Sequence, residues 1–159
     1  MNAMIIEEQK DILALDTRRR IFDAIKEQPG ICIRELERAL DLALGELTYH
    51  LPILLKGELI KEENDGYFRR FFPVGINAKE MNIISALRRD SVKRVVPLIL
   101  KNEKVTTQEI SQILGISHST AKWHLDRMEK NGLVNRKMIG RKHYFYFANI
   151  EGVKKIYCV

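Results

Sequence analysis

Residues 115–125 read Gly-Ile-Ser-His-Ser-Thr-Ala-Lys-Trp-His-Leu, and this stretch carries the clearest local structural signals in the chain. Gly115 can end a helix because glycine readily adopts the left-handed backbone conformation. Ser117 follows at the position where a hydroxyl would cap the next helix. The stretch therefore predicts two helices joined by a tight turn, the second covering about 118–130.

Further elements flank this turn. Thr106 and Glu109 have the spacing of a capping box, which would begin the helix before Gly115. Upstream, residues 90–100 have the apolar spacing of a helix, although Pro97 should kink it or move its start later. Downstream, the pattern predicts a β-hairpin with strands at 133–138 and 143–147 and a turn at 139–141.

The same pattern occurs earlier in the chain. Residues 16–72 align with residues 90–146 at an offset of 74 positions without a gap, and 11 of the 57 pairs are identical. The identical pairs include His50 with His124. A repeat of this length is a whole structural unit. The first copy therefore predicts its own helices at 17–27, 34–41 and 45–56 and its own strands at 58–63 and 67–72.

The motif at 115–125, followed by Gly132-Leu133-Val134, resembles that of winged helix-turn-helix transcription regulators, with the ArsR and MarR kinds nearest in local pattern. Thr48-Tyr49-His50-Leu51 and Lys122-Trp123-His124-Leu125 occupy corresponding places, so the chain looks like an archaeal tandem winged-helix regulator. The resemblance covers about 16–147. It implies a mainly α fold with small β-hairpin wings, in which two tandem winged helix-turn-helix units are joined by a helix. It also implies a sequence-specific regulator that binds double-stranded DNA.

The repeat also predicts the domain organisation. A capping box at Asn77 and Glu80 would open a helix between the copies, and we expect this helix to connect them rigidly. Segments at both ends of the chain could pair two subunits into a homodimer. The predicted divisions are an N-terminal helix at 1–15, winged-helix unit 1 at 16–76, a connecting helix at 77–89, winged-helix unit 2 at 90–149 and a C-terminal tail at 150–159.

The resemblance implies that the third helix of a unit enters the major groove while the wing contacts phosphates. With Ala121, Leu125 and Met128 of unit 2 facing inward, helical rotation turns Trp123 outward, and an exposed tryptophan usually marks a contact. The outward side chains suit base edges and phosphates. The predicted DNA-binding residues are Ser117, His118, Ser119, Thr120, Lys122, Trp123, Asp126, Arg127, Lys130, Arg136, Lys137, Arg141, Lys142 and His143.

The third helix of the first copy has a different outward face, which includes Pro52. This proline should also break the helix early. Residues 16–72 carry 10 Lys and Arg against 11 Asp and Glu, a net charge of −1, whereas residues 90–146 carry 11 against 5, a net charge of +6. Because protein cations displace counterions from DNA, we expect unit 2 to read DNA and unit 1 to serve packing, dimerisation or partner contact. Secondary DNA contacts in unit 1 would come from Thr48, Tyr49, Arg69 and Arg70.

Other functional classes find less support. The chain has no glycine-rich phosphate loop and no catalytic motif, so we expect no enzyme, no catalytic residue and no cofactor. Cys32 and Cys158 lack a metal-ligand spacing, and His118 and His124 point in different directions on one helix, so no metal site is expected. No apolar run approaches the roughly 20 residues that cross a membrane, and the low cysteine content suits a cytoplasmic protein.

Two alternatives stay open. In the first, the tandem units form a protein–protein interaction scaffold, with the transcription machinery as one class of partner. In the second, the chain is a ligand- or metal-responsive regulator with a pocket between the units, lined by Tyr67, Phe68, Phe71 and Phe72.

Overall fold

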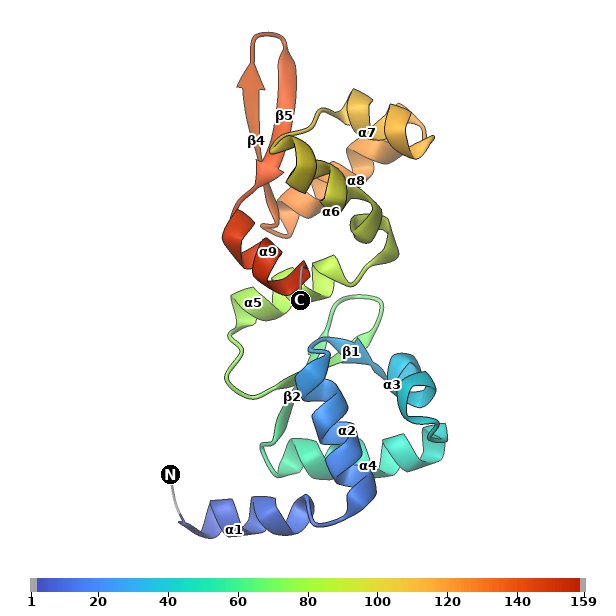
Figure 1. Ribbon diagram of the computed structural model, residues 1–159, viewed down its shortest axis with the longest axis vertical. Coiled ribbons are helices and arrows are strands. Elements are labelled where there is room, and N and C mark those ends of the chain that lie inside the picture. Colours follow the sequence, from blue (N-terminus) through green and yellow to red (C-terminus); the bar gives the residue numbers. More distant parts are fainter. Residues whose placement is uncertain (1–2, 158–159) are drawn as a thin grey trace. The chain divides into compact units, whose positions relative to one another are not determined.

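The computed structural model describes residues 3–157. Residues 1–2 and 158–159 lie outside it, and with them Cys158 and the outermost residues of the predicted N-terminal helix and C-terminal tail. The chain divides into two compact units, and the division falls after Met81, inside helix α5 (Ala78–Leu87) (Figure 1). The predicted capping box of this helix is present, since Asn77 and Glu80 each accept a hydrogen bond from the other's backbone amide.

Unit 1 has the predicted order of helices and hairpin, with two additions to the repeat. The elements are α1 (Ala3–Ile12), α2 (Asp16–Glu27), β1 (Ile31–Cys32), α3 (Ile33–Leu40), α4 (Leu44–Lys56), β2 (Ile60–Asn64) and β3 (Arg69–Pro73). The strands form an antiparallel sheet in the order β1-β3-β2. The sequence did not predict β1, because two residues are too few to show an alternating pattern.

Unit 2 repeats the same order and adds a last helix. The elements are α6 (Asp90–Asn102), α7 (Thr107–Leu114), α8 (His118–Lys130), β4 (Val134–Ile139), β5 (Lys142–Phe147) and α9 (Ile150–Tyr157) (Figure 1). Strands β4 and β5 pair antiparallel along their whole length. Helix α9 occupies the predicted tail, and its buried Val153 joins the hydrophobic core of unit 2.

Both prolines behave differently from the expectation. Pro52 lies inside α4 and Pro97 inside α6, so the predictions of an early break and of a late start were wrong. A proline within a helix costs roughly 3 kcal/mol, whereas each buried leucine contributes roughly 1.5–3 kcal/mol. Pro52 is exposed, and the opposite face of α4 buries Leu47, Leu51 and Leu54. The burial of these leucines keeps the helix continuous.

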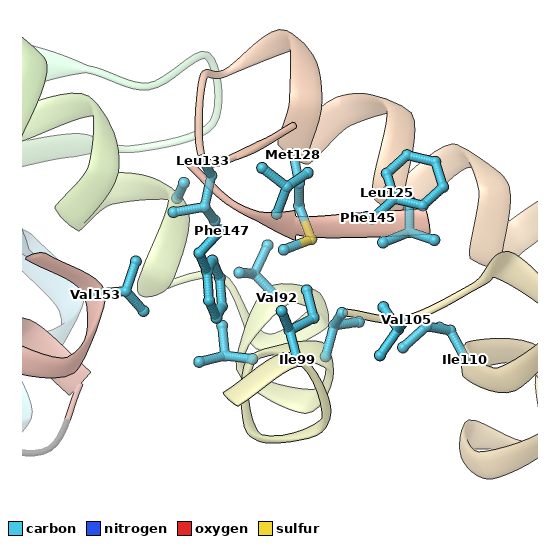
Figure 2. Close-up of a cluster of buried hydrophobic side chains, with 14 of the residues drawn as sticks. Val92, Ile99, Val105, Ile110, Leu125, Met128, Leu133, Phe145, Phe147 and Val153 are labelled. Carbon is cyan, nitrogen blue, oxygen red and sulfur yellow. The ribbon is translucent and has the colours of Figure 1, made fainter. Parts of the chain in front are cut away.

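The core of unit 2 is assembled from all of its helices and from the hairpin (Figure 2). Phe145 of β5 is 1% exposed. Its backbone exchanges two hydrogen bonds with Val105, at 2.9 and 2.8 Å, which attaches the hairpin to the segment before α7. The equivalent residues of unit 1, Ile31 and Phe71, are antiparallel partners in β1 and β3. The other labelled side chains of this core in Figure 2 are Val92, Ile99, Ile110, Leu125, Met128, Leu133, Phe147 and Val153.

Arg20 and Arg94 are identical residues at equivalent positions of the two copies, and they make the same hydrogen bond in both units. Arg20 donates to the Leu40 carbonyl at 2.8 Å, and the equivalent Arg94 donates to the Leu114 carbonyl at 3.1 Å. Each bond satisfies a carbonyl at the end of the second helix of its unit, where no helical donor is available. The first helix of each unit is thereby attached to the turn that precedes the third.

That turn requires a left-handed residue in both units. Gly115 has φ +64° and the equivalent Asp41 has φ +52°. Aspartate is one of the few residues with a side chain that visits this region without a large penalty. The two units therefore keep the same turn although only one of them uses glycine.

Arg70 and Asp65 form a buried ion pair in unit 1. Nε of Arg70 donates to Oδ2 of Asp65 at 2.5 Å, and Nη1 donates to the Gly30 carbonyl at 2.9 Å. The other oxygen of Asp65 accepts from the amides of Tyr67 and Phe68, both at 2.8 Å. Burial alone would raise the pKa of Asp65, but the hydrogen bonds from Arg70 and the two amides outweigh it and hold the pKa below its usual range. The pair closes the hairpin turn and attaches it to the loop before β1.

We expect Asp65→Asn to destabilise unit 1 by roughly 2–4 kcal/mol at neutral pH, because it strands the buried Arg70 guanidinium without its carboxylate. Urea unfolding followed by far-UV circular dichroism measures the loss. Since the folded-state pKa is lowered, the contribution of Asp65 is complete above its ordinary pKa of 3.8 and is lost as the pH falls through the lowered value. The difference between the two proteins should therefore shrink in acid.

The matched control is Glu62→Gln, which removes the partner of the exposed Arg69. Exposed pairs contribute at most about 1 kcal/mol, so this variant should unfold at nearly the original urea concentration. If Asp65→Asn were no less stable than Glu62→Gln, the buried pair would not hold the hairpin.

Candidate nucleic-acid interface

Helix α8 presents the face that the sequence predicted. Ala121, Leu125 and Met128 are buried, while Trp123 is 54% exposed. The helix begins at the predicted cap, where the Ser117 hydroxyl accepts from the Thr120 amide at 3.0 Å. Of the other residues predicted to face outward, two are half-buried, Asp126 and Arg127, and the rest are exposed: His118, Ser119, Thr120, Lys122 and Lys130.

The β4–β5 hairpin carries the second set of predicted DNA contacts, and it extends from the helices of unit 2 in Figure 1. Lys137 lies on β4, Arg141 in the turn, and Lys142 and His143 on β5, all exposed. Two apolar side chains beside the turn are exposed as well, Met138 and Ile139. A basic hairpin with an apolar tip can contact phosphates and also enter a groove.

Three predicted contacts are paired within the protein: Lys122, Asp126 and Arg136. Arg136 of β4 donates from Nη2 to Asp126 at 3.0 Å and from Nε to Glu129 at 3.2 Å, and its guanidinium lies 5.1 Å from the centre of the Phe145 ring. Asp126 also accepts from Lys122 at 2.5 Å. The network joins the wing to α8, so Arg136 and Asp126 have a structural role that the sequence pattern did not reveal.

A groove in unit 2 runs between the start of α7, the start of α8 and the hairpin. Of its lining residues, the sequence predicted His118, Lys122, Arg136, Lys142 and His143 and missed four, Thr106, Thr107, Gln108 and Phe145. None of the described side chains that line it is acidic. The start of α7 adds backbone N–H groups without helical acceptors, which favour anions. The capping box at Thr106 could have indicated Thr106, Thr107 and Gln108, because it marks the N-terminus of a helix.

The equivalent surface of unit 1 has a different chemistry. Leu44, Tyr67 and Phe68 occupy the positions of His118, Arg141 and Lys142, and they are 50%, 60% and 46% exposed. Tyr49, the equivalent of Trp123, is also exposed. Where unit 2 presents His118, Arg141 and Lys142, unit 1 therefore presents apolar side chains.

The predicted secondary DNA contacts of unit 1 have internal partners. Arg69 donates to both carboxylate oxygens of Glu62, at 2.9 and 2.5 Å. Arg70 is 3% exposed and paired with Asp65, so its guanidinium does not reach the surface. The Thr48 hydroxyl donates to carbonyls of its own helix. Of the four residues, only Tyr49 presents its side chain as the prediction required.

The predicted aromatic pocket is divided between core and surface. Phe71 and Phe72 are buried, whereas Tyr67 and Phe68 are exposed at the hairpin turn. Within residues 3–157, no three His, Cys, Asp or Glu side chains are placed to share a metal ion. No helix in the described part of the chain has the length and apolar character needed to cross a bilayer.

The histidines of the two third helices lie in matching surroundings. His50 packs against Tyr49 and His124 against Trp123, each with ring centres 5.0 Å apart in an edge-to-face arrangement. Burial lowers the pKa of His124, and the nearby Arg127 and Arg94 lower it further. Burial and Arg18 likewise lower the pKa of His50, although Glu46 acts in the opposite direction. Both side chains therefore favour the neutral form.

Comparison with known proteins agrees with this geometry. A family model described as an N-terminal HTH domain matches residues 15–84, and one described as a winged helix-turn-helix DNA-binding domain matches residues 76–135. The chain therefore contains two helix-turn-helix domains in tandem, and the predicted mainly helical fold with antiparallel hairpins is confirmed.

Curated relatives come from archaea, which confirms the archaeal resemblance. The chain is 29% identical over 142 residues to an uncharacterized HTH-type transcriptional regulator of Methanocaldococcus jannaschii, covering 89% of this chain and 36% of that protein. It is 23% identical over 131 residues to the probable HTH-type transcriptional regulator ArcR of Halobacterium salinarum, covering 77% of this chain and 50% of that one. The chain thus spans half or less of the length of these two relatives.

Solved structures similar to part of the chain include a transcriptional repressor and a winged helix-turn-helix DNA-binding domain. The transcriptional repressor PagR of Bacillus anthracis has a TM-score of 0.46 at 20% identity, covering 50% of this chain and 91% of that one. The homodimeric winged helix-turn-helix DNA-binding domain of Mb0332 from Mycobacterium bovis has a TM-score of 0.45 at 16% identity, covering 54% and 84%.

We expect unit 2 to lose stability as the pH falls below 6.5, the ordinary pKa of histidine, because the unfolded chain takes up a proton on His124 before the folded unit does. The loss should level off below the lowered folded-state pKa, and His124→Gln should reduce it. Urea midpoints from Trp123 fluorescence at pH 7.5 and 5.5 measure it, since this single tryptophan reports on unit 2. His50→Gln in unit 1 is the control and should leave these midpoints unchanged; an equal effect of both variants would contradict the assignment.

Proposed function

We propose that this protein is a transcriptional regulator that binds double-stranded DNA in a sequence-specific manner through α8 and the β4–β5 wing of unit 2. The observation that carries the proposal is the groove between α7, α8 and the hairpin, which basic side chains line without a described carboxylate. The names of the two archaeal relatives support the regulatory role. Regulation would act by occlusion or recruitment at a promoter and needs no chemistry.

Each element of unit 2 has its own part in binding. Helix α8 enters the major groove, where Ser119, Thr120 and Trp123 face base edges and thymine methyl groups. The exposed cations of the hairpin lie along the phosphates, which give most of the affinity and no sequence information. The groove at the start of α8 receives the adjacent backbone, and His118 and Gln108 are among its lining residues.

Unit 1 serves partner contact or dimerisation in this proposal. Its exposed Leu44, Tyr49, Tyr67 and Phe68 suit a protein surface better than a phosphate backbone. Helix α1 also exposes apolar side chains at its start, which could bury against a second subunit. These surfaces favour a second candidate function for unit 1 alone, as a protein–protein interaction module that contacts the transcription machinery.

We expect Arg141→Ala and Lys142→Ala each to weaken binding to random duplex DNA and to reduce the slope of log affinity against log salt by about one. Each variant removes one phosphate contact. Fluorescence anisotropy of a labelled duplex over a series of salt concentrations gives both quantities.

The matched control removes the cation of the equivalent hairpin in unit 1. Arg69→Ala should leave affinity and slope unchanged, because unit 1 does not contact the duplex in this proposal and the pair of Arg69 with Glu62 is not exchanged for a phosphate. Salt-insensitive binding by the unmodified protein, or no binding at low salt, would instead favour the interaction scaffold for both units.

A further inference from the structure

Asp126 is an acidic residue at the centre of a basic surface. It lies on the outward side of α8, one turn after Lys122 and one residue before Arg127. Both of its carboxylate oxygens are engaged: Oδ2 accepts from Lys122 Nζ at 2.5 Å and Oδ1 accepts from Arg136 Nη2 at 3.0 Å. One carboxylate thus occupies two cations that line the groove.

These ion pairs are open to solvent and can be exchanged. The side chains of Lys122, Asp126 and Arg136 are 55%, 36% and 31% exposed. Ion pairs between exposed side chains are weak and are screened by salt. A phosphate in the groove can therefore replace the carboxylate as partner of a cation, provided that the carboxylate finds another donor.

In DNA of arbitrary sequence, the position of that donor in the major groove changes with each base pair. A carboxylate facing phosphates is repelled by them, and in the major groove it is stabilised only by an amino group, above all the N4 amino group of cytosine. Asp126 therefore lowers affinity wherever the base edge within its reach presents acceptors, as guanine and thymine do. The penalty falls on the wrong sequences and leaves the right one unaffected, which is how repulsive contacts produce specificity.

Unit 1 has no carboxylate between two cations at the equivalent positions. The equivalents of Asp126, Lys122 and Arg136 are Pro52, Thr48 and Glu62. The arrangement of a carboxylate between two groove-lining cations belongs to the unit with the basic surface, so it is not part of the scaffold that the repeat preserves.

We propose that Asp126 is a specificity-determining residue, which withholds Lys122 and Arg136 from the phosphates of arbitrary DNA and releases them where a base amino group donates to it. The inference rests on the proposed function, since it concerns the same surface. It assigns the acidic residue a role opposite to that of its basic neighbours.

The test is Asp126→Ala, compared with the unmodified protein on random duplex DNA and on the duplex that the unmodified protein enriches from a random pool. On random DNA we expect about tenfold tighter binding at low salt and a salt slope steeper by about one, because Lys122 becomes available to phosphate. On the enriched duplex affinity should change less, so the ratio of the two affinities should fall. Thermal unfolding checks that the variant is folded.

Two further variants separate the effect of position from that of charge. Glu151→Ala removes a carboxylate on α9 that lies 3.6 Å from Lys154. It changes the net charge by the same amount as Asp126→Ala, but outside the proposed DNA-binding surface. It should leave affinity and slope unchanged. Asp126→Ala combined with Glu129→Ala frees Arg136 from both of its partners and should steepen the slope by about two.

The outcomes distinguish the inference from the function on which it rests. If the unmodified protein binds no duplex, or enriches none, the proposed function fails. If it binds and enriches DNA but Asp126→Ala behaves like Glu151→Ala on random DNA, the inference is overturned. It is also overturned if the variant loses affinity only for the enriched duplex, since Asp126 would then be an ordinary base contact.

Discussion

Two backbone hydrogen bonds between Val105 and Phe145 hold unit 2 in its arrangement. Because Phe145 is fully buried and its strand continues into the wing, these bonds place the hairpin at the start of α7. The hydrophobic core then holds α8 beside both of them. The groove that we propose as a phosphate site is a consequence of this constraint. Unit 1 contains the same constraint at Ile31 and Phe71, with the pairing extended into a short strand.

The repeat preserves interactions and varies exposed side chains. Arg20 and Arg94 make the same hydrogen bond, and so do Glu35 and Glu109, which accept from the backbone at the start of the second helix in each unit. The aromatic residue before each histidine keeps its exposure and its edge-to-face contact. Arg141 and Lys142 of the unit 2 hairpin align with Tyr67 and Phe68 in unit 1, which carry no charge. Two units with one scaffold therefore present one basic surface and one apolar surface.

The sequence predicted the second and third helices well because their ends depend on local chemistry. Capping at Thr106 and Ser117 and the left-handed Gly115 involve residues within one turn of each other. The bonds of Arg70 and Arg136 join residues 5 to 40 positions apart, so no local pattern announced them. Helix α9 was missed for the same reason, since its order depends on burying Val153 in a distant core.

By itself, the sequence determined that the chain contains two copies of one helix-turn-helix scaffold and that positive charge is concentrated in the second. Periodicity, caps and composition are enough for both conclusions. Only the tertiary structure decided which of the charged side chains face outward, because pairing depends on distances across the fold. Arg70 is directed to a buried aspartate and Arg136 to two carboxylates of α8, while Arg141 and Lys142 stay exposed.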